Sequence, residues 1–271
     1  MSRHPFTKLY HLQEAAKAQK ILVPPYDDRM EHLEGRQSVL AALAARQRKF
    51  DVILIRHGIH EEKIRDVLDA AAAMGVPIRR VDSRELDDIA HGATHGGVVA
   101  LCSAKPRAEA AEILEIAGKN PSPMFLLIEG IEDARNLGFV LRTAEAMGAS
   151  GVLIKKHLWD FDPVEIARPA SGAYERLPLA QIEDVSLLKT LRQRGLSLLG
   201  CVAGARTDIF SANLTGPIIL AIGGEKRGLS GAVRDICDGF ITIPTVVGAS
   251  SLSLSHAAAI VLAEASRQRR G

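Results

Sequence analysis

Apolar and polar positions in the first third of the chain follow helix and strand periods in alternation. Residues 61–74 place apolar side chains at i, i+3, i+4 and i+7, which predicts an amphipathic helix that ends at Gly75. Ser83 is expected to cap a short helix. The expected helices are 38–47, 61–74 and 85–89, and the expected strands are 51–55, 76–81 and 97–101. Together they predict a small α/β/α domain over residues 33–103.

The second half of the chain predicts a larger α/β domain. Apolar strand candidates alternate with helical stretches, a pattern typical of a mostly parallel sheet. These strand candidates are 124–128, 151–154, 196–202, 217–222 and 239–243. Before them, residues 104–122 indicate a linker with a short helix, since Pro121 and Pro123 break any longer one. We therefore expect an extension over 1–32, in which 12–20 are compatible with a helix, and a second domain over 123–271.

Composition narrows the class of protein. With 271 residues, 47% of them hydrophobic, the chain can bury a sizeable core without disulfide bonds. Its apolar runs fall far short of the ~20 residues that span a bilayer, and its N-terminus has no secretory pattern, so a cytoplasmic protein is expected. The net charge of +2 permits a polyanionic partner without demanding one. Cys102, Cys201 and Cys237 are expected to be buried reduced thiols.

The first segment that could carry chemistry is 129–138, which follows a predicted strand and leads into a helix. Ligands of open α/β sheets gather at such strand ends. Asn136 would either cap the helix or offer its amide to a substrate. Arg142 falls beside the apolar stripe of that helix, where it would either need a partner or reach the surface along its stem.

The second segment, 222–228, again lies between a predicted strand and a helix, which Ser230 is expected to cap. Gly223 and Gly224 would let the backbone approach a ligand or simply make a turn. The spacing fits neither a P-loop nor a dinucleotide fingerprint. A turn alone would not explain Glu225 ahead of two basic residues.

The third segment, 241–256, begins as a strand that Pro244 breaks. Four serines within six residues follow. They would cap the final helix or hold a polar ligand at its N-terminus. His256 is expected to be packed. The arginines at 267, 269 and 270 could contact phosphate, but a solvated, frayed terminus is favoured.

Jointly these segments resemble the motifs of the SpoU/TrmH family of RNA 2′-O-methyltransferases, within the SPOUT class. Asn136-Leu137-Gly138 with Arg142 resembles motif one, and Gly223 to Gly228 with Glu225 resembles motif two. Ile243-Pro244 with Ser251-Leu252 resembles motif three. Gly35-Arg36 and residues 95–98 resemble the family's N-terminal substrate-binding domain, so the likeness runs from about 33 to 267.

The resemblance implies S-adenosyl-L-methionine as cofactor, a trefoil-knotted catalytic domain, a ribosomal-protein-like RNA-binding domain and a homodimer. It assigns catalytic roles to Arg142, Asn136, Glu225 and Ser251, and cofactor contacts to Gly223, Gly224, Ile243, Leu252, Gly200 and Ser253. Because a guanidinium is a poor proton acceptor, we expect Arg142 to hold the target phosphate and hydroxyl, fixed by Asn136 and Ser251 and completed by Glu225.

Two departures from the family keep other functions open. Ser253 stands where the family usually has asparagine, and Thr245 where it has methionine. A non-catalytic RNA-binding assembly factor is therefore an alternative, as is a transfer RNA substrate in place of the favoured ribosomal RNA.

A metal protein is suggested by His57-x-x-His60 and His91-x-x-x-His95, but neither pair has the accompanying ligands of a zinc site, so no metal is expected.

Overall fold

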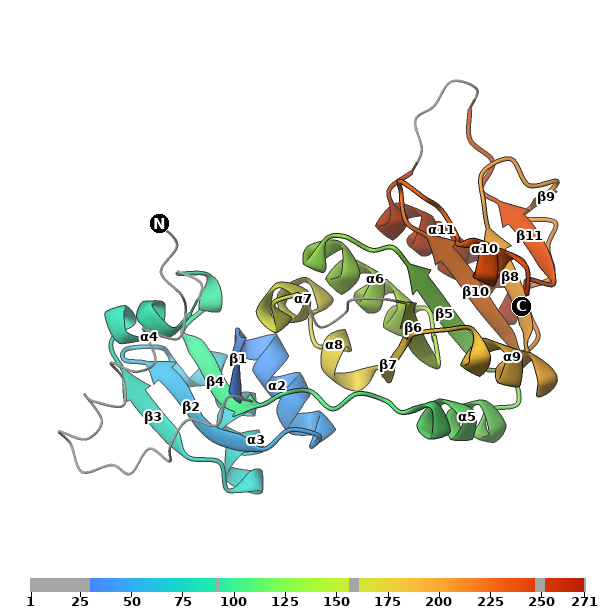
Figure 1. Ribbon diagram of the computed structural model, residues 1–271. Coiled ribbons are helices and arrows are strands. Elements are labelled where there is room, and N and C mark those ends of the chain that lie inside the picture. The colour runs from blue at the N-terminus through green and yellow to red at the C-terminus, as the bar shows by residue number, and fades with distance from the viewer. Residues whose placement is uncertain (1–29, 91–92, 156–160, 247–251, 271) are drawn as a thin grey trace. The chain divides into compact units, whose positions relative to one another are not determined.

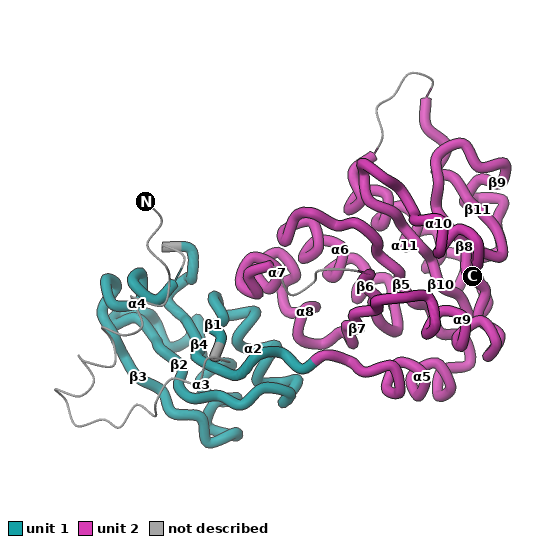
Figure 2. The backbone as a smooth tube through the Cα atoms, in the orientation of Figure 1, with its two compact units in different colours: residues 1–106 teal, residues 107–271 magenta. Residues whose placement is uncertain are grey.

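The computed structural model describes residues 30–270, except 91–92, 156–160 and 247–251 (Figure 1). The chain forms two compact units, residues 1–106 and 107–271, each described here by itself (Figure 2). The helix considered for 12–20 lies outside the described residues. Among the helices that are described, none has the length and apolar character needed to cross a bilayer.

The first unit is built on a sheet with the order β1-β4-β2-β3. Strands β1 and β2 run antiparallel to β4, and β3 is parallel to β2. Its strands are β1 (Met30–Glu34), β2 (Phe50–Arg56), β3 (Ile78–Val81) and β4 (Val98–Ser103). Its helices are α2 (Arg36–Ala45), α3 (Arg65–Met74) and α4 (Ser83–Ile89), with 3-10 turns at Glu61–Lys63 and Ala93–His95. Helix α2 packs on β1, β4 and α3, and α4 packs on β2.

Two local predictions for this unit need correction. The helix predicted over 61–74 divides at Ile64 into a 3-10 turn and α3, which does end at Gly75 in a left-handed conformation. Ser83 is not a cap, because the carboxylate of Asp82 accepts the Glu85 N–H at 2.8 Å and α4 begins at Ser83 itself. A carboxylate one residue earlier satisfies the same free N–H groups of the first turn.

The second unit holds a seven-stranded sheet, counted over the described residues, with the order β7-β6-β5-β10-β8-β11-β9. Every pairing between neighbouring strands is parallel, which confirms the predicted fold class. The strands are β5 (Met124–Glu129), β6 (Gly151–Lys155), β7 (Leu179–Ile182), β8 (Ser197–Cys201), β9 (Thr207–Asp208), β10 (Ile218–Gly223) and β11 (Gly239–Thr242). Strands β7 and β9 were not anticipated.

Helices cover both faces of this sheet. Since side chains alternate along a strand, Phe125 and Leu127 of β5 face one layer, where Ile113, Leu188 and Val233 of three helices share their core. Those helices are α5 (Ala110–Lys119), α9 (Ser186–Gln193) and α10 (Gly231–Arg234). The remaining helices are α6 (Ala134–Ala146), α7 (Pro163–Ala170), α8 (Ala173–Arg176) and α11 (Leu254–Arg270). Helix α11 packs against α6 and β10, and α7 and α8 pack against α6 (Figure 1).

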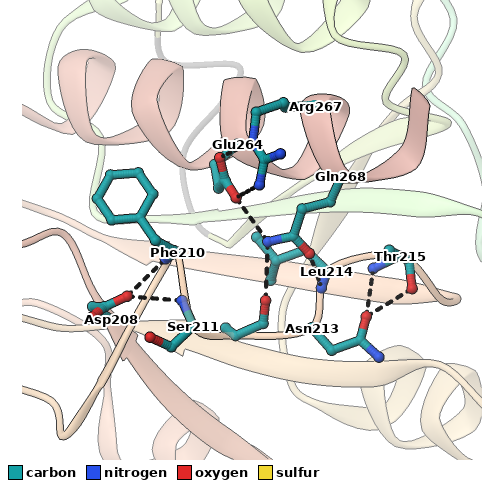
Figure 3. Close-up of polar contacts among 10 residues, drawn as sticks. Asp208, Phe210, Ser211, Asn213, Leu214, Thr215, Glu264, Arg267 and Gln268 are labelled. Carbon is teal, nitrogen blue, oxygen red and sulfur yellow. Dashed lines mark hydrogen bonds and ion pairs between the residues drawn. The ribbon is translucent and has the colours of Figure 1, made fainter. Parts of the chain in front are cut away.

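The C-terminal turns of α11 are anchored to the segment between β9 and β10. Gln268 accepts the Leu214 N–H at 2.9 Å and donates to the Ala212 carbonyl at 3.0 Å (Figure 3). Arg269 donates to the carbonyls of Leu214 at 2.9 Å, Ser122 at 2.8 Å and Gly216. The expectation of a frayed arginine tail is therefore wrong, because these arginines lie in a helix, where Arg269 satisfies backbone carbonyls.

The three cysteines are free thiols in different environments. Cys102 is buried as expected, whereas Cys201 and Cys237 are only partly buried. Burial nevertheless raises the pKa of each of these last two thiols to about 11. Because the thiolate is the reactive form, the raised pKa predicts that these two thiols react slowly near neutral pH.

Candidate active site at the carboxyl edge of the parallel sheet

Two neighbouring strands near the centre of the large sheet end at the same edge. Strands β5 and β10 are neighbours, and their last residues Glu129 and Gly223 lie in register. After β5 the chain enters α6, which packs with α11 on one face, whereas after β10 it reaches α10, whose Val233 belongs to the core of the other face. Chains that leave adjacent strand ends toward opposite faces create the position at which open α/β sheets bind ligands.

The first segment forms the start of α6 at this edge. Asp133 caps the helix by accepting the Asn136 N–H at 2.8 Å, so the interpretation of Asn136 as the cap is wrong. The Asn136 side chain instead accepts a hydrogen bond from the Ser255 hydroxyl at 3.4 Å. Motif one and the start of α11 are therefore in direct contact.

Gly138 of the same motif is required by packing. A Cβ built there would lie 2.5 Å from the carbonyl oxygen of Ile166 and closer still to Cγ of Pro169. Helix α7 therefore crosses α6 so closely that only glycine fits between them. This contact fixes the position of the helix that carries Asn136 and Arg142.

Arg142 lies on the exposed side of α6, so the structure favours surface placement over a buried partner. It lies six positions after Asn136, about 9 Å along the helix axis. Within the described residues Arg142 makes no hydrogen bond or ion pair. The expected link to Glu225 is not formed, since that carboxylate accepts the Leu254 N–H at 3.3 Å.

The glycines of the second segment are required by the chain's own backbone. A Cβ at Gly223 would overlap the backbone of Gly228 and Leu229, and one at Gly224 would overlap the carbonyl oxygen of Gly130. The Gly228 N–H also donates to the Gly224 carbonyl at 2.8 Å, which closes a tight loop. Glu225, Lys226 and Arg227 are exposed at its tip.

The third segment contributes the end of β11 and the start of α11. Ile243 is partly buried and Leu252 is 37% exposed, while Ser251 lies outside the described residues. The Ser253 hydroxyl accepts the His256 N–H at 3.4 Å and lies 2.6 Å from His256 Nδ1, so it caps α11. His256 is exposed, and the expectation that it is packed is wrong.

Gly200 is buried near the end of β8, below the edge. A Cβ there would lie 2.9 Å from a ring carbon of Phe240 and 3.0 Å from Cδ1 of Leu229. Its missing side chain therefore makes room for core packing beneath the loops of motifs two and three.

The structure also brings together three polar residues whose mutual contacts sequence reasoning missed. Lys155 Nζ donates to Glu129 Oε1 at 2.8 Å and to the Ser230 hydroxyl at 2.9 Å, and the Ser230 N–H donates to Glu129 Oε2 at 2.7 Å. The Ser230 hydroxyl makes no capping bond on α10, contrary to prediction. A charged residue at the end of an apolar strand, at Glu129 and again at Lys155, was the signal available in the sequence.

The suggestion of a metal protein finds no counterpart in the part of the chain that the structure describes. No group of three or more histidine, cysteine, aspartate or glutamate side chains there is arranged to hold a metal ion. His91 lies outside the described residues. At the sheet edge the structure places the Asn136 amide, the Glu225 carboxylate and the exposed Arg142 side chain.

Comparison with known sequences agrees with this geometry. Residues 123–263 match the SpoU rRNA Methylase family, and residues 32–108 match the family described as RNA 2′-O ribose methyltransferase substrate binding. A 23S rRNA (guanosine-2′-O-)-methyltransferase RlmB of Vibrio parahaemolyticus is 31% identical over 88% of this chain and 97% of its own length. The RlmB of Pseudomonas putida is 32% identical over 89% of this chain and 98% of its own.

Solved structures show the same fold. A crystal structure of an RNA 2′-O ribose methyltransferase matches with a TM-score of 0.75 and 25% identity, covering 98% of this chain and 96% of that one. The SpoU methyltransferase AviRb from Streptomyces viridochromogenes, in complex with the cofactor AdoMet, matches with a TM-score of 0.75 and 22% identity over 100% and 99% of the two chains. The chain therefore belongs to the SpoU rRNA methylase family of RNA 2′-O-ribose methyltransferases.

Proposed function

We propose that the chain transfers a methyl group from S-adenosyl-L-methionine to a ribose 2′-hydroxyl of ribosomal RNA. One observation supports this above the others: motifs one and two both contact the start of α11, through Asn136 with Ser255 and Glu225 with Leu254. Three segments spread over 120 residues thus meet at one sheet edge, where a substrate and a cofactor would lie side by side. In this proposal residues 33–103 present the RNA and residues 123–271 carry the reaction.

The residues at the edge fit an adenosyl cofactor. Loops of this kind offer backbone N–H and carbonyl groups, and exposed apolar side chains at Val246 and Leu252 give a surface for an adenine ring. We assign cofactor contacts to the backbone at 223–225, to Ile243, Leu252 and Ser253, and to the strand end above Gly200. When bound, the cofactor supplies an electrophilic methyl group on a sulfonium.

In the proposed mechanism Arg142 binds and orients the RNA. Its exposed guanidinium has free donors for the phosphate and the hydroxyl of the target nucleotide, in the geometry that arginine offers to phosphate. The hydroxyl proton would pass to that phosphate, because the guanidinium cannot accept it. Asn136, Ser251 and Glu225 would complete the site around the target ribose. Orientation of this kind accounts for roughly 7–11 kcal/mol in well-aligned reactions.

The proposal extends to the substrate, the assembly and the location. The ribosomal RNA specificity of the curated relatives favours ribosomal over transfer RNA here. We propose a cytoplasmic homodimer of knotted methylase units, joined through the face of α6 and α11. In support, Phe139 on α6 is 50% exposed, an unusual position for a phenyl ring unless a partner covers it. Phe139→Asp should shift the mass measured by light scattering from dimer to monomer.

The function is tested by transfer of tritiated methyl from S-adenosyl-L-methionine to total RNA that lacks the modification, with mapping of 2′-O-methyl positions. We expect label at one ribose of ribosomal RNA. Arg142→Ala should lower kcat/KM by roughly a hundredfold or more. Arg194→Ala removes another exposed arginine, which follows α9 and donates to the Leu114 carbonyl, and it should leave turnover unchanged.

The other outcomes separate the alternatives. Label in transfer RNA would move the substrate assignment and keep the activity. Cofactor binding without methyl transfer would support the non-catalytic assembly factor, and Ser253→Asn would then test whether the family's residue restores turnover. Near-normal turnover by Arg142→Ala would refute the proposed role of that residue.

A further inference from the structure

Three polar groups meet beneath the loop of motif two, and we call them the Glu129–Lys155–Ser230 cluster. They come from the ends of β5 and β6 and from a position just beyond the loop, and they are 26 to 101 positions apart in sequence. The strand register places Glu129 beside Lys155 on one side and beside Gly223 on the other. The Glu129 and Lys155 side chains are only 12% and 17% exposed.

The three residues of the cluster form hydrogen bonds with one another. Both oxygens of Glu129 are used, one by Lys155 and one by the Ser230 N–H. Burial acts to raise the pKa of Glu129, but the bonds from Lys155 and Ser230 together hold it below its ordinary value. The Glu129 carboxylate is therefore charged at neutral pH. A buried charge that has lost its partner destabilises the fold, so removal of either Glu129 or Lys155 should disturb the structure around the cluster.

The cluster lies at one end of the motif-two loop, which is held in place at both ends. The loop of motif two is fixed at its start, where Gly224 touches the backbone of Gly130, and closed by the bond between Gly228 and Gly224. At its far end, Ser230 is held through both its N–H and its hydroxyl. Glu225 projects from the tip between these two anchors and reaches Leu254. The cluster is thus the anchor that fixes the loop against β5 and β6.

We propose that Glu129 and Lys155 are positioning residues for methyl transfer, which hold the loop of motif two in the conformation that binds the cofactor. This inference rests on the proposed function only for the identity of that cofactor. Lys155, a lysine at the sheet edge of an RNA-binding protein, would otherwise be taken as a phosphate contact. Its two contacts inside the protein assign it to the loop instead.

The experiment compares Lys155→Met, Glu129→Gln and Ser230→Ala with the wild-type chain. Lys119→Met is the matched control, since Lys119 pairs with Glu115 on the exposed surface of α5. Binding of S-adenosyl-L-methionine without RNA is measured by calorimetry, together with KM for each substrate. Lys155→Met and Glu129→Gln should weaken cofactor binding about tenfold, equivalent to ~1.4 kcal/mol, with KM for RNA unchanged. Ser230→Ala should have a smaller effect, because its N–H bond to Glu129 remains.

A second measurement separates this inference from the proposed function. Hydrogen exchange of the peptide covering 223–230 reports the loop directly and requires no cofactor. Exchange should be faster in Lys155→Met and Glu129→Gln and unchanged in Lys119→Met. If the wild-type chain bound no S-adenosyl-L-methionine, the proposed function would fail, and the exchange data would still decide the role of the cluster.

Two results would overturn the inference. The first is exchange and cofactor affinity in Lys155→Met equal to those of the wild-type chain. The second is a rise in KM for RNA alone, which would make Lys155 an RNA contact. Should Lys155→Met fail to fold, as judged by circular dichroism, Glu129→Gln and Ser230→Ala supply the same comparison with a smaller perturbation.

Discussion

Replacement of Gly138 by alanine tests whether the close crossing of α6 and α7 fixes the active site. In an exposed helix, glycine to alanine gains up to ~1 kcal/mol from helix propensity. At Gly138 the new Cβ would instead overlap the Ile166 carbonyl and the Pro169 ring, neither of which is the end of a flexible side chain. Overpacking of that kind costs ~1–3 kcal/mol. We expect a net loss of roughly 1–2 kcal/mol in the free energy of unfolding, or about 2–8 °C in Tm.

Gly118→Ala on α5 is the matched control, because a Cβ there meets no atom within 4 Å. It should stabilise the protein by a few tenths of a kcal/mol up to ~1 kcal/mol. Urea unfolding followed by circular dichroism gives both values. Because α6 carries Asn136 and Arg142, its displacement in Gly138→Ala should also lower kcat, by up to about a hundredfold. A Gly138→Ala variant as stable and as active as Gly118→Ala would refute the packing argument.

Three further predictions concern groups away from the reaction. Hydrogen bonds from Arg267 and Gln268 hold the pKa of Glu264 at about 2. The stability that ionised Glu264 gives the fold is therefore complete above its ordinary pKa of 4.5 and is lost as the pH falls from there toward 2. Glu264→Gln should remove that loss in urea titrations from pH 6 to 2.5. Arg269→Met keeps the aliphatic stem but leaves carbonyls unsatisfied, and thermal unfolding should show a cost of roughly 1–3 kcal/mol. The native thiols of Cys201 and Cys237, with pKa values near 11, should react slowly with iodoacetamide at pH 8 and rapidly in urea; equal rates would contradict the burial argument.

The sheet was predictable from sequence because its central strands are buried on both faces and read as apolar runs. Strand β9, with two residues, carries too short a pattern, and β7 is a short strand at the edge of the sheet. Strand β1, missed as well, is an edge strand whose sequence Met-Glu-His-Leu-Glu has no regular alternation of apolar and polar residues.

The site was predictable as three segments but not as a set of contacts. The cap at Asp133 could have been found, since its carboxylate lies three residues before the N–H that it accepts. The pairing of Glu129 with Lys155, and the need for glycine at 138, depend on elements far apart in sequence. Such contacts follow from register and helix crossing, which one sequence does not encode in any local pattern.

The place of β10 between β5 and β8 has a consequence for synthesis on the ribosome. Strand β5 emerges early, yet one of its edges stays open until β10 is made, almost ninety residues later. The part of the apolar stripe of α6 that packs on α11 also stays uncovered until α11, the last helix described, has been made. A nascent chain with an open strand edge and an uncovered helix is exposed to aggregation. Because motifs from both ends of this unit must come together, we expect its folding to benefit from chaperones. Depletion of chaperones that bind nascent chains should then lower the soluble yield of this protein.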